Sequence, residues 1–233
     1  LPDAISNLTQ LQQLNLNDNQ LTTLPDAISN LTQLQQLNLN DNQLTTLPKL
    51  IVRLTNLERL FVSRNGLTAL PEDFSQLQQL TWLALGGNMI PSFSSSIEKF
   101  TKLTHLFLWG SKLYVLPEKI FLLKDLEALY ISKTGLTDLP LSFIHLKKLK
   151  TLSLDNNPLN PDIYAAYEQG LDAIKQFIQA KNEGVSRAPL FIRFLKSRVS
   201  CETVIHPCFK RLKDSERTTP IHFAHFRAGY PVV

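Results

Sequence analysis

The segment Leu1–Thr23, LPDAISNLTQLQQLNLNDNQLTT, recurs letter for letter as Leu24–Thr46. Five further units follow with the same 23-residue period and a drifting sequence, and they begin at Leu47, Leu70, Phe93, Leu116 and Leu139. The seven units fill residues 1–161 without an insertion or a deletion. A fixed period of roughly 20 to 50 residues is typical of a solenoid, in which each unit buries its apolar side chains against the next.

Each unit carries a pattern of the form L-x-x-L-x-L-x-x-N-x-L, which the first unit fills with Leu11, Leu14, Leu16, Asn19 and Leu21. Leu14 and Leu16 alternate with polar residues, and such alternation predicts a short strand whose leucines point inward. The pattern resembles the leucine-rich repeat family over residues 1 to about 183. The resemblance implies an α/β fold, a leucine-rich repeat solenoid with a curved parallel β-sheet on the concave face and short helices or turns on the convex face.

An asparagine ends the pattern in five of the seven units, at Asn19, Asn42, Asn65, Asn88 and Asn157. A buried asparagine can bond backbone groups where the chain leaves a strand, so we expect these side chains to form a ladder. Ser111 and Thr134 interrupt the series. Because a hydroxyl can make part of the same bonds, we expect local loosening in the fifth and sixth units rather than a break.

The outer half of each unit reads like Leu24–Leu31, with a proline in the second position. Pro25 indicates a turn, and the spacing of Ile28 and Leu31 places both on one side of a helical turn. We therefore assign these residues to the core.

Side chains alternate along a strand, so the third, fifth and seventh letters of the pattern point to solvent on the concave face. In the first two units these letters are all Gln or Asn. In the third to sixth units aromatic and basic residues replace many of them. The residues that we expect to contact a partner are Arg59, Phe61, Arg64, Trp82, His105, Phe107, Trp109 and Tyr130.

Equivalent letters of successive units are neighbours in a parallel sheet, about 4.8 Å apart. One predicted row holds Phe61, Ala84, Phe107 and Tyr130, and the row beside it holds Arg59, Trp82 and His105. Three small residues, Ala84, Gly86 and Gly87, predict a floor between Phe61 and Phe107 that admits a side chain from a partner.

An exposed aromatic cluster bordered by polar groups is typical of a binding site, and Trp, Tyr and Arg dominate binding hot spots. The sequence therefore predicts a scaffold that binds a protein or peptide on its concave aromatic face. Two alternatives stay open: the C-terminal tail covers this face, or the rings only stack on one another and stiffen the sheet.

Residues 162–184 have the pattern of a helical C-terminal cap, which a solenoid needs over its last unit. Asp162 is the expected helix N-cap, and Gly184 the expected stop. We expect one bent helix or two short helices around Gly170, with Tyr167, Phe177 and Ile178 in the core. The apolar residues at helical spacing are Ile163, Ala166, Tyr167, Leu171, Ile174, Phe177 and Ile178.

The segment 157–180, NPLNPDIYAAYEQGLDAIKQFIQA, is similar to the junction that follows the repeats in bacterial proteins with a Ras-of-complex (Roco-type) GTPase domain. The resemblance implies a GTPase module after the repeats, with a G-x-x-x-x-G-K-[ST] phosphate loop. No such sequence occurs in the chain. The alternative function is therefore that of a repeat fragment of a larger Roco-type signalling GTPase, with a regulatory or oligomerisation role.

The tail, residues 185–233, is basic, because the last 50 residues hold nine Lys and Arg against three Asp and Glu. These charges are scattered among apolar residues rather than clustered, which argues against a nucleic-acid or membrane partner. Cys201, His206, Cys208, His222 and His225 raise the possibility of a zinc site, but the short Cys-x-x-Cys pair of such sites is missing. We therefore expect no metal and no cofactor.

The chain offers no nucleophile with a partnered base and no recognisable pair of catalytic carboxylates, so we expect no enzyme activity and no small-molecule substrate. Its two cysteines both lie in the tail, which favours a reducing compartment. We therefore expect a cytoplasmic location.

Overall fold

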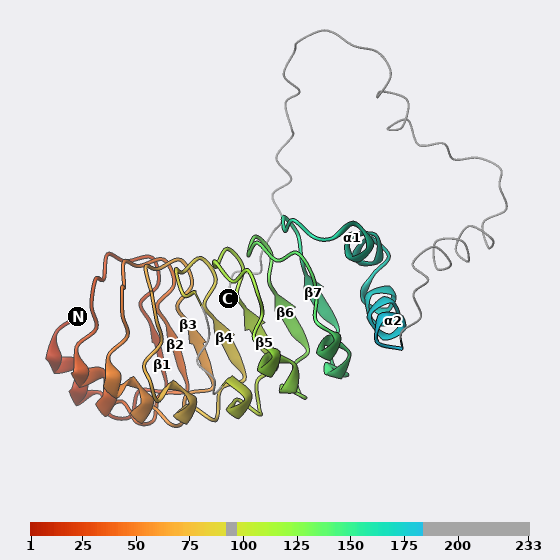
Figure 1. Ribbon diagram of the computed structural model, residues 1–233. Helices are drawn as coiled ribbons and strands as arrows, with labels where there is room; N and C mark the ends of the chain where they lie inside the picture. The colour runs from red at the N-terminus through yellow and green to blue at the C-terminus, as the bar shows by residue number, and fades with distance from the viewer. Residues whose placement is uncertain (92–96, 184–233) are drawn as a thin grey trace, which may run out of the picture. The chain divides into compact units, whose positions relative to one another are not determined.

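The computed structural model describes residues 1–91 and 97–183 of the 233-residue chain. Seven short parallel strands lie side by side in chain order and form one sheet (Figure 1). The strands are β1 (Gln13–Asn15), β2 (Gln36–Asn38), β3 (Arg59–Phe61), β4 (Trp82–Ala84), β5 (His105–Phe107), β6 (Ala128–Tyr130) and β7 (Thr151–Ser153). The predicted solenoid, with one strand in each unit, is confirmed.

The register follows directly from the repeat length. Each residue of a strand pairs with the residue 23 positions further along the chain, as Leu60 does with Leu83. Because no unit gains or loses a residue, the leucines of neighbouring strands stack and the concave letters form continuous rows.

A short 3-10 helix precedes each strand and forms the opposite side of the solenoid (Figure 1). In the second unit the helix follows Pro25, and the amide of Leu31 donates to the carbonyl of Ile28. Ile28 and Leu31 are fully buried, which confirms the predicted core positions. The seven helices are η1 (Asp3–Asn7), η2 (Asp26–Asn30), η3 (Lys49–Arg53), η4 (Phe74–Gln76), η5 (Ile97–Lys99), η6 (Glu118–Leu122) and η7 (Leu141–His145).

The asparagine ladder is present and connects neighbouring units. Asn88 is buried, and its Nδ2 donates to the carbonyls of Val62, one unit back, and Leu85. Its Oδ1 accepts from the amide of Leu67. The equivalent atoms of Asn42, Asn65 and Asn157 make the same kind of bonds.

The two hydroxyl residues in the series replace only part of this network. Ser111 Oγ donates to the carbonyl of Leu108, and Thr134 Oγ1 donates to that of Ile131. Among the described residues, neither side chain bonds to the preceding unit, so both bonds that asparagine makes to that unit are missing at each of the two positions.

Two helices cover the last unit, and Gly170 separates them with φ +101°. They are α1 (Pro161–Glu168) and α2 (Leu171–Asn182). The predicted N-cap, Asp162, was wrong: Asn160 Oδ1 accepts from the amide of Asp162 at 2.9 Å. Pro161 is the reason, because a proline suits the first helical position, where no amide bond is needed, and the cap then falls one residue before it.

Tyr167 of α1 attaches the cap to the seventh unit. Its hydroxyl donates to Asp155 Oδ1 at 3.0 Å and accepts from the amide of Leu154 at 3.1 Å. Ile174 and Ile178 of α2 are fully buried, as expected for a cap. The predictions for residues 184–233, including the stop at Gly184, the Cys and His set and coverage of the concave face by the tail, lie outside the described residues.

Candidate functional site

The register brings the predicted contact residues together in two rows. Arg59, Trp82 and His105 are aligned across β3, β4 and β5, and Phe61, Ala84, Phe107 and Tyr130 are aligned across β3 to β6. Trp109 and Arg64 follow strands β5 and β3. We call the surface formed by Arg59, Phe61, Arg64, Trp82, His105, Phe107, Trp109 and Tyr130 the aromatic face.

Four of the rings form two stacked pairs between neighbouring strands. The Trp82 and His105 ring centroids are 4.0 Å apart with planes at 13°, and those of Phe107 and Tyr130 are 4.5 Å apart at 5°. Parallel rings at such short distances touch through their faces, since side-by-side rings would need a wider separation. The ring edges therefore point out of the sheet and toward solvent.

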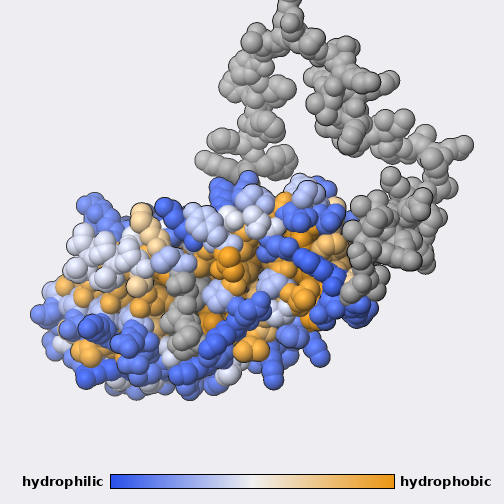
Figure 2. Space-filling view, in the orientation of Figure 1, coloured by the Kyte–Doolittle hydropathy of each residue, from blue (hydrophilic) through white to orange (hydrophobic). Residues whose placement is uncertain are grey.

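Trp82 also contacts the second row. Its ring lies 5.7 Å from that of Phe107 and 6.3 Å from that of Phe61, both tilted. Stacking between the rings thus occurs, as one of the alternatives predicted, yet each of these side chains remains only half-buried within the described part of the chain. Figure 2 shows polar side chains over much of the visible surface, with apolar surface between them in the half that contains β5 to β7.

The predicted small-residue floor is occupied by the protein itself. A Cβ added to Gly86 would lie 2.5–2.7 Å from three atoms of the Trp109 indole, so the ring rests flat on the backbone of Gly86. Trp109 also approaches Gly87, where φ is +70°. At the two glycines, the expectation that this floor admits a partner's side chain was therefore wrong, because Trp109 fills the space that the missing Cβ leaves.

The two arginines of the aromatic face differ in their contacts. The guanidinium of Arg64 binds the carboxylate of Asp41, with Nη2 2.7 Å from Oδ2, and lies 5.9 Å from the Trp109 ring centroid. The hydrogen bond to Asp41 raises the pKa of Arg64. Arg59 is exposed and has no ion-pair partner among the residues that the structure describes.

The electrostatic environment of His105 is set by burial and by one ion pair. Lys150 Nζ lies 2.8 Å from Glu127 Oε2, and this hydrogen bond lowers the pKa of Glu127. Burial lowers the pKa of His105, while the charge of Glu127 acts in the opposite direction and that of Lys150 in the same direction. The imidazole is therefore mainly neutral at pH 7.

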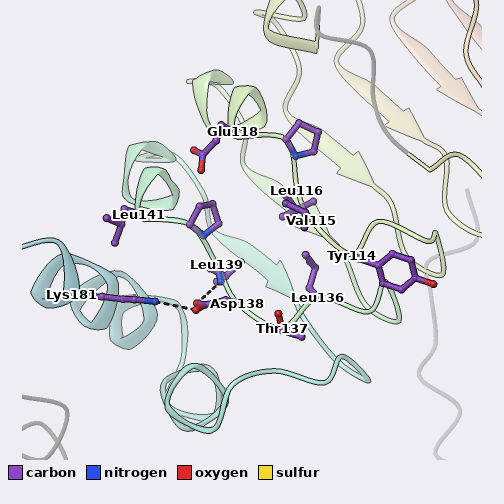
Figure 3. Close-up of a pocket in the computed structure, with 12 residues that line it drawn as sticks. Tyr114, Val115, Leu116, Glu118, Leu136, Thr137, Asp138, Leu139, Leu141 and Lys181 are labelled. Atoms are coloured by element: carbon purple, nitrogen blue, oxygen red, sulfur yellow. Dashed lines mark hydrogen bonds and ion pairs between the residues drawn. The ribbon is translucent and has the colours of Figure 1, made fainter. Parts of the chain in front are cut away.

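A hollow that the sequence analysis missed lies beside helix α2. It is enclosed by α2 and by the two segments that follow strands β5 and β6 (Figure 3). Its volume is about 480 Å³, and apolar side chains line most of it. Tyr114 and Val115 at its edge are 65% and 79% exposed, and Lys181 pairs with Asp138 at 3.0 Å. The available signal was the replacement of Thr22 and Thr23 of the first unit by Tyr114 and Val115 in the fifth.

We expect Gly86→Ala to displace Trp109 from the sheet, because the new Cβ would overlap the indole. In a Trp82→Phe background, where Trp109 is the one remaining tryptophan, its emission should shift to the red and its quenching by acrylamide should increase. The stability cost should be about 1–2 kcal/mol.

Gly66→Ala is the matched control for Gly86→Ala. A Cβ there meets only ordinary contacts, at 3.5 Å from the carbonyl of Leu44 and 3.7 Å from Thr45. If the emission of Trp109 is the same in Gly86→Ala and in Gly66→Ala as in the parent, the contact between its indole and Gly86 would be contradicted.

No group of three or more His, Cys, Asp or Glu side chains suited to a metal occurs within residues 1–91 and 97–183. In those same ranges, no helix combines the length and the apolar character needed to cross a membrane.

Family models for leucine-rich repeats match most of the repeat region. The model described as "Leucine-rich repeat region" matches residues 2–106, and that described as "Leucine rich repeat" matches residues 101–159. No curated protein matches the chain.

Several solved structures are similar. An internalin from Listeria monocytogenes is 29% identical with a TM-score of 0.62, and the match covers 68% of this chain and 45% of the internalin. The leucine-rich repeat domain of the type III effector XopL is 27% identical with a TM-score of 0.60, and the match covers 71% of this chain and 68% of the XopL domain. The plant peptide hormone receptor RGFR1, in complex with RGF2, is 29% identical with a TM-score of 0.61, and the match covers 70% of this chain and 27% of the receptor. The match thus spans less than half the length of the internalin.

Proposed function

Because the chain belongs to the leucine-rich repeat family, we propose that it is a non-enzymatic interaction module that binds a protein or peptide on the aromatic face. The observation that carries the proposal is a continuous cluster of half-buried rings across four adjacent strands, β3 to β6. Such clusters of Trp, Tyr and Arg supply most of the energy in protein interfaces.

The contrast between units supports the same proposal. In the first two units the equivalent positions carry only Gln and Asn, and the scaffold beneath them is built with the same leucines. The aromatic residues are therefore not needed for the fold of a unit. The stacked pairs also hold the rings in place before binding. Less side-chain entropy is then lost when a partner binds, which favours affinity.

A plant peptide hormone receptor is among the similar structures, which is consistent with a peptide as partner. The proposal includes a cytoplasmic location, supported by a repeat region without cysteine. A nucleic acid, a membrane surface or a small-molecule substrate is not part of it.

A role as the repeat part of a larger Roco-type signalling GTPase is the second candidate. It is supported by segment 157–180, whose two helices α1 and α2 cover the seventh unit at the position where such a junction is expected. This role is regulatory or oligomeric, and it does not exclude a partner on the aromatic face.

We expect Trp82→Ala to weaken peptide binding by about 2 kcal/mol or more, which is roughly 30-fold in Kd. Trp82 contacts His105, Phe107 and Phe61, so its loss removes the centre of the cluster. Peptides would be selected from a random library displayed on phage, synthesised, and titrated by isothermal calorimetry.

Gln36→Ala is the matched control, because Gln36 occupies the same row on β2, two strands from Trp82. Its affinity should equal that of the parent, and circular dichroism should show that both variants are folded. If Trp82→Ala binds the selected peptides as tightly as Gln36→Ala does, the partner does not bind on the aromatic face.

A further inference from the structure

We infer that Nε2 of His105 accepts a hydrogen bond from a backbone N–H of an extended peptide that crosses strands β3 to β6. This inference rests on the proposed function, and it names both the chemistry of the ligand and the atom that recognises it.

The tautomer of His105 follows from the hydrogen bonds of Thr104. Thr104 Oγ1 lies 3.0 Å from the carbonyl oxygen of Thr81 and 2.9 Å from Nδ1 of His105. A hydroxyl has one proton, and a carbonyl oxygen can only accept it. Both contacts are attractive only if the hydroxyl donates to Thr81 and Nδ1 donates to the hydroxyl. In the neutral imidazole Nε2 is then an unprotonated acceptor.

Nε2 is available to a ligand. It has no hydrogen-bond partner among the residues that the structure describes. The one buried side-chain N or O atom without a partner in those residues is Glu98 Oε2, so Nε2 of the half-buried His105 is in contact with solvent.

The neutral state of the imidazole is favoured from several sides. Burial beside Trp82 lowers the pKa of His105, and Lys150 acts in the same direction. Glu127 opposes this effect, but its carboxylate is bound to Lys150. The remaining charged residue on the row is Arg59, two strands away.

The geometry of the rings favours a peptide over a carbohydrate. A sugar stacks on the faces of aromatic rings, but in both stacked pairs the rings cover faces of one another. The exposed ring edges carry partial positive charge and attract carbonyl oxygens. A peptide backbone supplies such oxygens and alternates them with N–H donors.

The polar atoms at the two ends of the surface fit the same ligand. Arg59 on β3 offers donors, and the hydroxyl of Tyr130 on β6 has no partner among the described residues. Three strand spacings separate them, about 14 Å, which equals about four residues of extended chain. His105 lies between them on β5 and provides the acceptor that matches a backbone N–H.

Protonation of His105 would convert Nε2 from an acceptor into a donor, which would then oppose the N–H of the ligand. Because burial holds the pKa of His105 below its ordinary value, the affinity should be highest at neutral pH and should fall as the pH drops through that lowered pKa.

The first test needs no ligand. Nitrogen-15 NMR of histidine-labelled protein near neutral pH, with the His105 signals assigned by their loss in His105→Gln, should show Nδ1 protonated and Nε2 unprotonated. The opposite tautomer would overturn the inference even if peptides bind.

The second test uses a synthetic peptide selected from the phage-displayed random library on the parent chain. His105→Phe keeps a ring to stack on Trp82 but removes the acceptor, and we expect about tenfold weaker binding. His105→Gln, which keeps an acceptor, should recover part of the loss. The exposed His145 of η7 provides the control, since His145→Phe should leave the affinity unchanged.

A double-mutant cycle identifies the donor. Methylation of one backbone nitrogen of the peptide should weaken binding to the parent about tenfold, and the same peptide should lose little further affinity for His105→Phe. The parent should also lose affinity on acidification, whereas His105→Phe should not.

The outcomes separate this inference from the proposed function. Peptides that need Trp82 but bind His105→Phe as tightly as the parent, with the same pH profile, would refute the role of His105 alone. A library that yields no peptide with preference for the parent over Trp82→Ala would refute both.

Discussion

Phe143→Ala should lower the free energy of unfolding by about 3–5 kcal/mol, the largest effect that we expect from a single substitution. Phe143 lies on η7 with 0% exposure, and its ring meets that of Phe121 edge to face at 6.1 Å. Helix α2 packs on η7, so truncation would leave a cavity beneath the cap. Because a solenoid is stabilised by contacts between neighbouring units, the loss of the cap would also weaken the units before it.

Leu141→Ala provides the control for Phe143→Ala, since Leu141 lies on the same helix and is 42% exposed. Urea unfolding followed by circular dichroism should give a loss below about 1 kcal/mol for this variant. Similar losses in both variants would mean that η7 contributes through its backbone and that the Phe143 ring is not a core element.

Asn88→Ala should lower the free energy of unfolding by about 3 kcal/mol, because the buried amide of Leu67 and the buried carbonyl of Leu85 would lose their partner, while the carbonyl of Val62 would keep its bond from Asn65. Asn88 is 3% exposed. It donates to the carbonyls of Val62 and Leu85 and accepts from the amide of Leu67. Alanine cannot bond to any of them, and water has little access to the site.

Two variants calibrate the effect of Asn88→Ala in urea unfolding. Asn19→Ala removes an exposed side chain at the same position of the first unit, where water can replace the bonds, so the loss should stay below about 1 kcal/mol. Asn88→Ser copies Ser111 and should recover about a third of the loss, since a hydroxyl can bond to one carbonyl. Equal effects of the two alanine variants would contradict a role of the ladder in linking units.

The aromatic face combines two properties that are usually opposed. Its rings stack on one another, which stabilises the sheet, and they stay half-exposed, which leaves area for a partner. In the proposed function, the binding energy would come from ring edges and from polar atoms such as His105 Nε2 and the Arg59 guanidinium. This arrangement favours a ligand that combines apolar side chains with backbone hydrogen bonds over a purely apolar one.

Several features of the site could be predicted because the repeat length is constant. Leu60 and Leu83 stack, and Trp82 and His105 become neighbours, since each pair is separated by 23 residues. The asparagine ladder follows for the same reason. Once the units stack without insertions, the periodicity alone decides which side chains share a row and which face they occupy.

The prediction of the N-cap residue of α1 was wrong because two neighbouring residues have similar capping chemistry. Asp162 and Asn160 are both good capping residues, and the sequence pattern did not distinguish them. Pro161 decides which of them caps the helix. Its fixed φ suits the first helical position, so Asn160 lies one residue before the helix and becomes the N-cap. The error shifted the start of the helix by one residue.

The sequence by itself determined the solenoid, its seven parallel strands, the rows of the aromatic face and the presence of a helical cap, because all of these depend on period and alternation. Only the tertiary structure decided the seat of Trp109 on Gly86, the stacking of Trp82 on His105, the bonds of Thr104 and the hollow beside Tyr114. The physical reason is that side-chain torsions depend on the space left by residues of neighbouring units. That space exists only after the units have packed together.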